Sequence, residues 1–551
     1  MKENQLTAKE EKIYGLAYPK LTNSQLSALD RFAVLTTYRD EEILFEAGES
    51  TLKFFVIKTG KVEICEDFNN RKKTVIVHEP REFTGDINML SERPSLVTAV
   101  AKGNCQVYEI SADVFKQIVN EIPQLSDCIL QAFLSRRELL ESNGFAGLKV
   151  VGSKFSRDTF RIKNFLSRNK ILFTWIDIEK DYSTYKLLKQ FEISVDEMPI
   201  VAFENNKIFK NPSNLELGKL VGITKTLEDK VYDLAIVGAG PAGLAAAVYG
   251  ASEGLETVVL EKTAPGGQAG CSSKIENYMG FPTGLSGTDL ANRALLQAQK
   301  FGAQFSTPAE VISMKCNSHY NVLKLASGES VTSRCILIAT GVSYRKLAIE
   351  GCERFEGSGV YYSATKVEAQ ICRDSTIIIV GGGNSAGQAA IFLSQYAEQI
   401  LLIVRGDDLS ESMSQYLVGR LPQIDNIKLL VNTQIEKMDG DHVLRTVEIK
   451  NNKTRQTKTV ETSAVFIFIG ATPHTDWLPT HINVDNKGFI KTGSQVFESK
   501  LWSVTRKPFL LETSCPGVFS AGDVRSDSIK RVASAVGEGS MTVKFVHRLL
   551  S

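Results

Sequence analysis

The sequence predicts a multidomain protein in which a β jelly roll with flanking helices is followed by a small α/β domain and then by a long α/β region. Three observations predict this architecture. At about 150 residues per domain, a chain of 551 residues corresponds to three or four domains and excludes a single core. Before residue 148, apolar and polar residues alternate along the chain, which is typical of strands. After it, strand-like runs alternate with helix-like runs. Two glycine-rich turns, at 238–243 and 381–386, each follow an apolar strand and open a helix.

The composition narrows the class of protein. Lys+Arg 64 against Asp+Glu 63 gives a net charge of +1, so bulk electrostatics favours neither nucleic acid nor an acidic membrane as partner. The 9 cysteines include no Cys-x-x-Cys, which excludes a disulfide framework, and the 6 scattered histidines lead us to expect no metal site. The start MKENQLTAKEEK lacks a signal-like apolar run, and no segment reaches the roughly 18 apolar residues of a membrane span. We therefore expect a cytoplasmic protein.

The first domain is expected over residues 1–145. A helical spacing at Leu26, Leu29 and Phe32 gives way to the alternating runs EEILFEAGE, KFFVIKTGKVEIC, KTVIVHEP and CQVYEI, which are separated by turn residues. This pattern predicts the jelly roll. The segment ESNGFAGLK forms the boundary to the next domain.

The second domain is expected over residues 148–224. The strand-like runs LKVVGS, ILFTWIDI and MPIVAFENNKIFK alternate with the helix-like runs DTFRIKNFLSRN and YSTYKLLKQF, which indicates a small α/β unit. The charged stretch TKTLEDK reads as a linker to the third region, residues 229–551.

The first glycine-rich turn predicts a dinucleotide site. An apolar strand leads into Gly238-x-Gly240-x-x-Gly243, an alanine-rich helix follows, and a second strand ends at Glu261. The first glycine permits the tight turn, and Gly240 lets a pyrophosphate approach the helix N-terminus. Glu261 can accept from a ribose hydroxyl. Pro241 and Ala242 complete the predicted turn. The alternative is a glycine turn that serves only packing. It does not explain why strand, turn, helix, second strand and acid occur in this order.

The second turn repeats the design with Gly381-x-Gly383, and Ala386 stands in the third position, where alanine is permitted. Asn384 and Ser385 lie between them. At the end of the next strand stands Arg405, which suits the extra phosphate of NADP, whereas an Arg on a solvated strand end is the alternative. Two such folds imply a flavoprotein with a resident flavin and a diffusible nicotinamide donor.

Residues 231–551 resemble low-molecular-weight thioredoxin reductases. The matching motifs are GAGPAG, GGQ, ENYMGFP, ATG, GGGNSA, IGATPHT, GVFSAGD and KRVASAVGEG. The resemblance implies a two-Rossmann flavoprotein and a homodimer, with an FAD domain (229–348 and 472–551) and an inserted NAD(P) domain (349–471). It implies that further residues approach FAD: Gly266, Gly267, Gln268, Asn277, Gly522, Asp523, Arg531, Val532 and Ala533.

One departure from that family affects the electron path. The family carries Cys-Ala-Thr-Cys before the second Rossmann strand, and this chain has Ser363-Ala364-Thr365-Lys366, with Val367 in place of the acid that follows. Serine and lysine cannot exchange disulfides. Cys271 and Cys372 are interpreted as structural thiols. The basic NADP motif is reduced to Arg405 alone, so NADH is an alternative donor.

Residues 21–140 resemble cyclic-nucleotide-binding domains, through LFEAGE, FFVIKTGKVEI and FTGDINMLSERPSLVTAV. In that family a segment called the phosphate-binding cassette, expected here at FTGDINMLSERPSLVTAV, holds the ribose and the cyclic phosphate. The corresponding positions here are Gly85, Asp86 and Ser95, and the phosphate-binding Arg is missing because Arg93 precedes Pro94. A cyclic nucleotide, another ligand, or no ligand remain alternatives.

Residues 148–222 resemble a thioredoxin or glutaredoxin fold, through the strand and helix order and through Met198-Pro199, where that family has its cis-proline turn. The start of the first helix, 155–159, carries no Cys. The resemblance therefore implies a thioredoxin-like domain that cannot exchange disulfides.

The function expected from these patterns is an FAD-dependent oxidoreductase that takes hydride from NADPH or NADH. Its acceptor would be a quinone, an iron–sulfur or flavin protein, or oxygen. One alternative is a thioredoxin-disulfide reductase that uses cysteines elsewhere. Another is a signalling protein in which flavin redox state or an N-terminal ligand alters partner binding.

Overall fold

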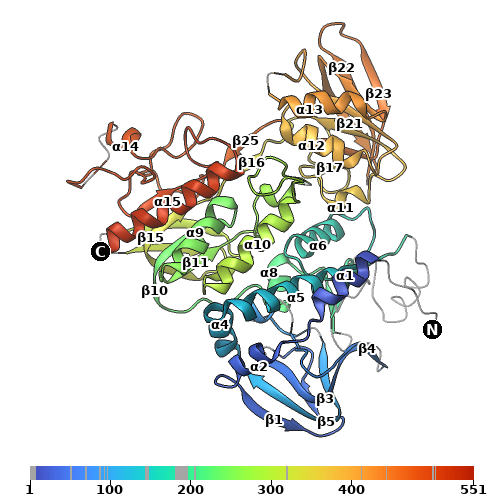
Figure 1. Ribbon diagram of the computed structural model, residues 1–551. Helices are drawn as coiled ribbons and strands as arrows, with labels where there is room; N and C mark the ends of the chain where they lie inside the picture. The colour runs from blue at the N-terminus through green and yellow to red at the C-terminus, as the bar shows by residue number, and fades with distance from the viewer. Residues whose placement is uncertain are drawn as a thin grey trace. The chain divides into compact units, whose positions relative to one another are not determined.

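The computed structural model describes residues 8–49, 53–68, 71–85, 88–91, 93–95, 97–142, 148–179, 197–203, 207–272, 274–317, 320–410, 412–441, 443–498, 502 and 504–551. These residues divide between two compact units (Figure 1). The first takes the chain up to Gly152, Lys170–Thr224 and the short piece Gln299–Phe301. The second takes Ser153–Asn169, Lys225–Ala298 and Gly302–Ser551.

The N-terminal part of the first unit contains the predicted β-strands. Its five-stranded antiparallel sheet has the order β1-β5-β3-β4, and β2 pairs with β5. The strands are β1 Val34–Tyr38, β2 Ile43–Phe45, β3 Phe54–Phe68, β4 Arg71–His78 and β5 Thr98–Ile110. The helices are α1 Ala8–Ala17, α2 Asn23–Leu29, α3 Asn88–Ser91, α4 Ala112–Glu121 and α5 Pro123–Ser142. Four buried phenylalanines, at positions 54, 83, 115 and 133, join the sheet to the helices. Each of their rings contacts two of the others.

The same unit holds a second, mixed sheet with the order β7-β6-β8-β9. Its elements are β6 Leu148–Gly152, β7 Thr174–Asp177, β8 Ile200–Phe203, β9 Lys207–Lys210 and the helix α8 Asn214–Leu220. Strands β6 and β7 are parallel, whereas β8 is antiparallel to both β6 and β9. The Met198–Pro199 peptide is cis. The helix expected over 182–191 lies outside the described residues.

The second unit contains the first predicted dinucleotide fold. Its main sheet has the order β12-β11-β10-β15-β14-β13, with β26 paired to β15. The strands are β10 Val231–Val237, β11 Thr257–Leu260, β12 Gln304–Ser306, β13 Val311–Cys316, β14 Asn321–Leu325, β15 Ser330–Ile338 and β26 Val518–Ser520. Its helices are α9 Pro241–Ser252, η2 Ala269–Cys271, α10 Gly287–Lys300, α14 Ser494–Glu498 and α15 Val532–Leu550.

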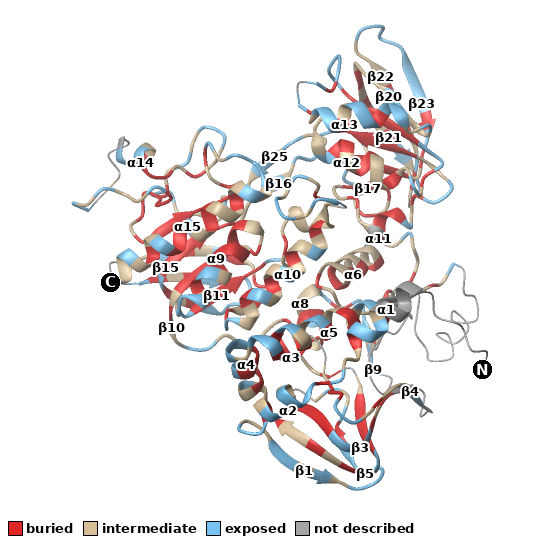
Figure 2. Cartoon of the chain, viewed as in Figure 1, coloured by how far each residue is buried: buried red, intermediate tan, exposed pale blue. Residues whose placement is uncertain are grey.

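The apolar run of β10 is explained by burial on both faces of this sheet. Leu234 and Ile236 pack into one core with α9, α10 and α15, whereas Ala235 and Val237 pack into the core on the opposite face. The residues of β10 from Leu234 to Val237 are accordingly all buried (Figure 2). Helix α15 runs close against α9, because a Cβ on Gly539 would lie 2.1 Å from the Ala242 carbonyl oxygen.

The second dinucleotide fold lies between β15 and β26 in the chain. Its all-parallel sheet has the order β17-β24-β18-β19-β20, and an antiparallel sheet β21-β22-β23 accompanies it. The strands are β17 Val360–Tyr361, β18 Thr376–Val380, β19 Gln399–Ile403, β20 Ile427–Leu430, β21 Thr433–Gly440, β22 Leu444–Asn451, β23 Thr457–Glu461 and β24 Ala464–Ile467. The helices are α11 Lys366–Ala369, α12 Asn384–Leu393, α13 Gln415–Arg420 and η3 Leu421–Gln423. The chain enters this fold through β16 Val342–Tyr344 and leaves it through β25 Ala471–Pro473, which pair with each other.

Helix α6 (Arg157–Arg168) belongs by its packing to the second unit, although it follows β6 in the chain. The ring of Phe160 lies 5.1 Å from that of Tyr361, and Asn169 donates a 2.9 Å hydrogen bond to the Thr263 carbonyl. None of the helices in the described part of the chain is long and apolar enough to cross a membrane.

Candidate nucleotide sites and the electron path

The first glycine-rich turn is built from backbone alone. Gly238 has φ +102, and a Cβ there would lie 2.5 Å from the Ala339 carbonyl oxygen, so only glycine fits. Helix α9 begins directly after Gly240, whose position as N-cap offers no side-chain acceptor to the first N–H groups. These groups therefore remain available to an anion, as in other dinucleotide-binding turns.

A second glycine segment lies in front of this helix start. A Cβ on Gly267 would be 3.0 Å from the Gly240 Cα, and Gly266 donates a 2.7 Å hydrogen bond to the Ala239 carbonyl. Side chains at these positions would fill the space beside the N-terminus of α9. The third glycine of the motif, Gly243, serves packing, because a Cβ there would lie 1.9 Å from the Gly238 carbonyl oxygen.

Glu261 is buried at the end of β11 and is partly used by the protein itself. Its carboxylate accepts from the backbone N–H of Ala239 at 2.7 Å, of Thr263 at 2.9 Å and of Ala264 at 3.2 Å. A carboxylate has about four acceptor positions, so one remains for a ribose hydroxyl. Glu261 therefore orders the turn and keeps one acceptor position for the predicted ribose hydroxyl.

Asp523 follows β26 and keeps its carboxylate free. Within the described residues it makes no hydrogen bond, and burial raises its pKa, with Lys530 opposing and Glu538 adding to the shift. The neighbouring backbone is fixed, since Gly522 donates at 2.7 Å to Glu538, which also pairs with Arg525 at 2.5 Å. A half-buried carboxylate without a protein donor fits the hydroxyl groups of FAD. Together with the glycine turn, these residues can hold that cofactor.

The remaining residues predicted to approach FAD occupy varied settings. The Gln268 amide donates to the Val342 carbonyl, so it ties this loop to β16. Asn277 is exposed. Arg531 is the N-cap of α15 without a side-chain cap, and Val532 and Ala533 form the first turn of that helix.

The second glycine-rich turn has the same construction. Gly381 has φ +141 and lies too close to the Phe468 carbonyl for any side chain. Gly383 caps α12 without a side-chain acceptor, which again leaves N–H groups for a phosphate. The side-chain oxygen of Asn384 accepts from the Ser414 backbone N–H at 2.7 Å. Arg405 follows β19, is exposed, and forms no ion pair with any described residue.

Tyr344 lies close to residues of both dinucleotide folds, and no sequence motif points to it. It is the last residue of β16, and burial raises the pKa of its hydroxyl. A hydrogen bond with Ser385, at the start of α12, lowers that pKa, while Cys271 and Asp523 on the first fold raise it. The hydroxyl is therefore within electrostatic reach of both predicted nucleotide sites.

The position of the family's redox cysteines is occupied by a helix cap. Thr365 caps α11, and its side chain and backbone N–H both donate to Glu368, the latter at 2.7 Å. The Ser363 hydroxyl donates to the same carboxylate at 2.9 Å, and Glu368 is fully buried. The Thr-x-x-Glu spacing of this capping box is present in the sequence, but a comparison with the family motif, which aligns Val367 with the family's acid, does not predict the role of Glu368.

Cys271 and Cys372, both interpreted from the sequence as structural, are held as thiols. Burial raises the pKa of Cys271, whose sulfur lies 3.7 Å from the Gly267 carbonyl. Burial also raises the pKa of Cys372, which is fully buried and donates to the Glu368 carbonyl at 3.3 Å. Since the thiolate is the nucleophile in disulfide exchange, neither is prepared for it.

In the N-terminal domain, two of the predicted ligand positions, Gly85 and Ser95, line a small cavity of about 80 Å³. The Ser95 hydroxyl donates to Val97 at 2.8 Å, and the Gly85 carbonyl accepts from Arg136. Asp86 lies outside the described residues. Arg136 also donates to Ala17 and Phe83, so it is held by carbonyl groups of the domain. Ligand pockets usually measure about 300–1,000 Å³, so this cavity is smaller than a usual ligand pocket.

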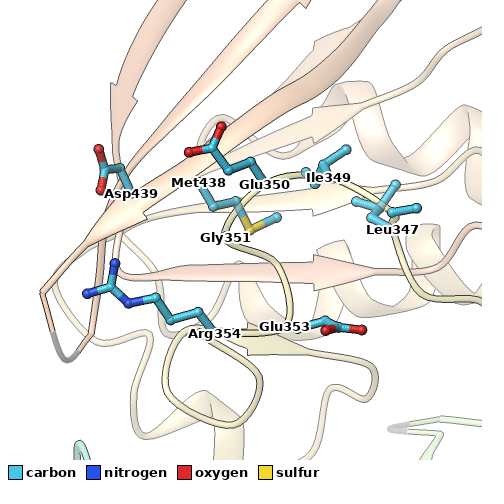
Figure 3. Close-up of a pocket in the computed structure, with 9 residues that line it drawn as sticks. Leu347, Ile349, Glu350, Gly351, Glu353, Arg354, Met438 and Asp439 are labelled. Carbon is cyan, nitrogen blue, oxygen red and sulfur yellow. The ribbon is translucent and has the colours of Figure 1, made fainter.

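A larger cavity of about 370 Å³ lies in the second unit, between the segment 347–354 and β21 (Figure 3). Its lining includes Glu350, Glu353, Arg354 and Asp439, and Lys437 forms a 3.2 Å ion pair with Glu350 beside it. None of the residues of either glycine-rich turn lines this cavity, so it is separate from the predicted nucleotide sites.

Two phosphate-binding turns on two Rossmann folds define a protein that binds two dinucleotides. A model of the pyridine nucleotide-disulphide oxidoreductases matches residues 232–539, and the chain belongs to this family. It is an FAD-dependent NAD(P)H oxidoreductase similar to thioredoxin reductases. A model of the cyclic nucleotide-binding domain matches residues 35–121, so the resemblance of the N-terminal domain is confirmed.

Individual relatives cover the same C-terminal region. The chain is 33% identical over 310 residues to a thioredoxin reductase of Treponema pallidum, covering 56% of this chain and 94% of the relative. It is 30% identical over 323 residues to the "34.2 kDa protein in rubredoxin operon" of Clostridium pasteurianum, covering 59% and 98%. The crystal structure of T. acidophilum thioredoxin reductase matches with a TM-score of 0.53 at 28% identity, covering 59% of this chain and 100% of that one.

Proposed function

We propose that this flavoenzyme passes electrons from NAD(P)H to an acceptor other than a disulfide at the family's usual position. The observation that carries the proposal is the cap around Glu368. The Ser363 and Thr365 hydroxyls both bond this buried carboxylate, so no group at α11 can attack a disulfide.

The residues of the chain would act by binding and positioning. FAD, when bound, accepts a hydride from the nicotinamide and releases electrons to the acceptor. The free N–H groups at the start of α9 and α12 would bind the two pyrophosphates, and Asp523 would accept from a hydroxyl of FAD. Tyr344, which is largely buried and bonds Ser385 at the start of α12, would help to keep water out of the site.

Helix α6 supports the same proposal. It packs on Tyr361, two residues before Ser363, and it is the first helix of the region that resembles a thioredoxin fold. We propose that residues 148–224 form such a fold, because the order β7-β6-β8-β9 with parallel β6 and β7 fits it. The start of α6 carries Ser156 as its cap and no cysteine. Neither α6 nor the segment 363–366 near Tyr361 therefore has a thiol for disulfide exchange.

The acceptor is tested by a stopped-flow screen on the reduced holoenzyme. Benzoquinone, oxygen and an oxidised rubredoxin are mixed with it, the last because one relative is named after a rubredoxin operon. We expect at least one of these to reoxidise the flavin rapidly, and thioredoxin disulfide to reoxidise it no faster than buffer. Rapid, saturable reoxidation by thioredoxin disulfide would instead favour a reductase that uses other cysteines.

We propose that the N-terminal domain does not bind cyclic nucleotides in this conformation. The cavity of about 80 Å³ and the engagement of Arg136 by Phe83 and Gly85 support this. Calorimetry of the full chain with cAMP and with cGMP is expected to show no binding heat. Saturable binding that changes the rate of flavin reduction would establish a nucleotide-regulated enzyme instead.

A further inference from the structure

Three residues that are far apart in the sequence meet on the FAD-binding fold. Cys316 ends the edge strand β13, His481 lies in the loop after β25, and Cys515 precedes β26. Their ligand atoms, two thiol sulfurs and an imidazole nitrogen, all lie within 4.8 Å of one another. Among the residues that the structure describes, this is the one group of three such side chains at metal-binding spacing.

The spacing fits a tetrahedral ion. With Zn–S of about 2.3 Å and Zn–N of about 2.0–2.1 Å, sulfur and nitrogen ligands of a tetrahedral site lie roughly 3.5 Å apart. The distance from the Cys316 sulfur to the His481 Nε2 atom is 3.5 Å. Thiolate and imidazole together are the ligand types that zinc prefers.

The backbone holds the ligands in place. Cys515-Pro516-Gly517-Val518 forms a turn in which Val518 donates to the Cys515 carbonyl at 3.0 Å and Gly517 has φ +80, as a type II turn requires. Ser514 joins this turn to the histidine loop, because its hydroxyl donates to the His481 carbonyl at 2.6 Å and accepts from Asn483 at 2.8 Å. Two of the three ligand segments are thus fixed relative to each other.

The ligand atoms must lose protons before they can bind an ion. Each thiol is a ligand only as a thiolate, so binding of an ion releases the protons of Cys316 and Cys515.

We propose that Cys316, His481 and Cys515 bind one zinc ion, with water as the fourth ligand because His481 is exposed. Two thiol protons are released and no electrons are transferred. The site lies at the N-terminal end of β26, whereas Asp523 follows its C-terminal end, so zinc ties β13 and the histidine loop to the FAD fold without entering the electron path. The expectation of no metal site rested on the lack of a ligand cluster in the sequence, and the fold supplies that cluster.

The test is the metal content of the holoenzyme. We expect about one zinc per chain after dialysis, and less than one fifth of that in the Cys316→Ser, Cys515→Ser and His481→Ala variants. Cys128→Ser is the matched control, since Cys128 is a half-buried thiol of the N-terminal domain, and it should keep the metal. Cobalt substitution should give sulfur-to-cobalt charge-transfer bands and the strong visible bands of tetrahedral Co²⁺.

Three results would overturn the proposal. They are wild-type protein without zinc that fails to take up zinc or cobalt, a Cys316–Cys515 disulfide found by mass spectrometry in the purified protein, and zinc retained by all three variants. The flavin spectrum of each variant shows whether it has folded. Where a variant loses its flavin, cobalt bands and a count of reactive thiols on the wild-type protein decide the matter alone.

Discussion

Gly240→Ala is expected to fold and to lose most of its FAD. Gly240 has φ −72, and a Cβ there would be 4.0 Å from the nearest protein atom outside its neighbours, the Gly267 Cα, so the protein itself accommodates alanine. The new methyl group would instead meet the pyrophosphate at the start of α9. Overpacking of this kind costs about 1–3 kcal/mol, a factor of roughly 5 to 150 in affinity. The ratio of flavin to protein absorbance after desalting measures the loss.

The matched control for that variant lies in the second turn. Gly383 is also an N-cap, has φ −93, and would place a Cβ 3.9 Å from the Ser412 carbonyl oxygen. Gly383→Ala should therefore retain FAD and instead bind the nicotinamide nucleotide more weakly. If Gly240→Ala keeps its flavin through desalting as the wild type does, the first turn does not hold the pyrophosphate of FAD.

Replacing Arg405 by alanine is expected to weaken NADPH and to leave NADH unchanged. Arg405 is exposed after β19, next to the turn that precedes α12, and its guanidinium is free of ion pairs with described residues. Hydrogen bonds to a charged group contribute about 1.5–3 kcal/mol, so KM for NADPH should rise roughly 10- to 150-fold. Steady-state kinetics with both donors measures the ratio.

Arg373→Ala serves as the control for Arg405, because Arg373 is exposed and precedes the opposite, N-terminal end of β18. It should change neither donor. Equal losses for NADPH and NADH in Arg405→Ala, or no loss for either, would show that Arg405 does not read the 2′-phosphate. Arg405 would then contribute nothing to selectivity for NADPH over NADH.

The folds of both nucleotide sites could be predicted because their signals are local. A strand, a glycine turn and a helix are adjacent in the chain, and the close approaches at Gly238 and Gly381 allow only glycine there. The all-apolar run of β10 follows from burial on two faces of a parallel sheet. The missing dithiol was also visible, because Ser363 and its neighbours stand within a recognisable motif.

Other features depend on contacts between distant segments and had no local signal. Arg136 reaches carbonyl groups more than 50 positions away in the chain, and it lines the cavity of the N-terminal domain. Tyr344 acquires its role only because β16 passes between two folds. The three ligands of the proposed zinc site come from the end of β13, the loop after β25 and the turn before β26. Glu261 shows the opposite case, since its predicted ligand role is shared with backbone bonds that only the folded turn creates.

The most direct test of the account is the number of electrons that the holoenzyme accepts. Anaerobic titration with dithionite, followed by the flavin spectrum and by a count of thiols before and after, measures it. FAD accepts two electrons, and a redox-active disulfide accepts two more. We predict two electrons per FAD and an unchanged thiol count, because Ser363 and Thr365 are bonded to Glu368 and carry no sulfur. Uptake of four electrons per FAD, with two new thiols, would contradict the account.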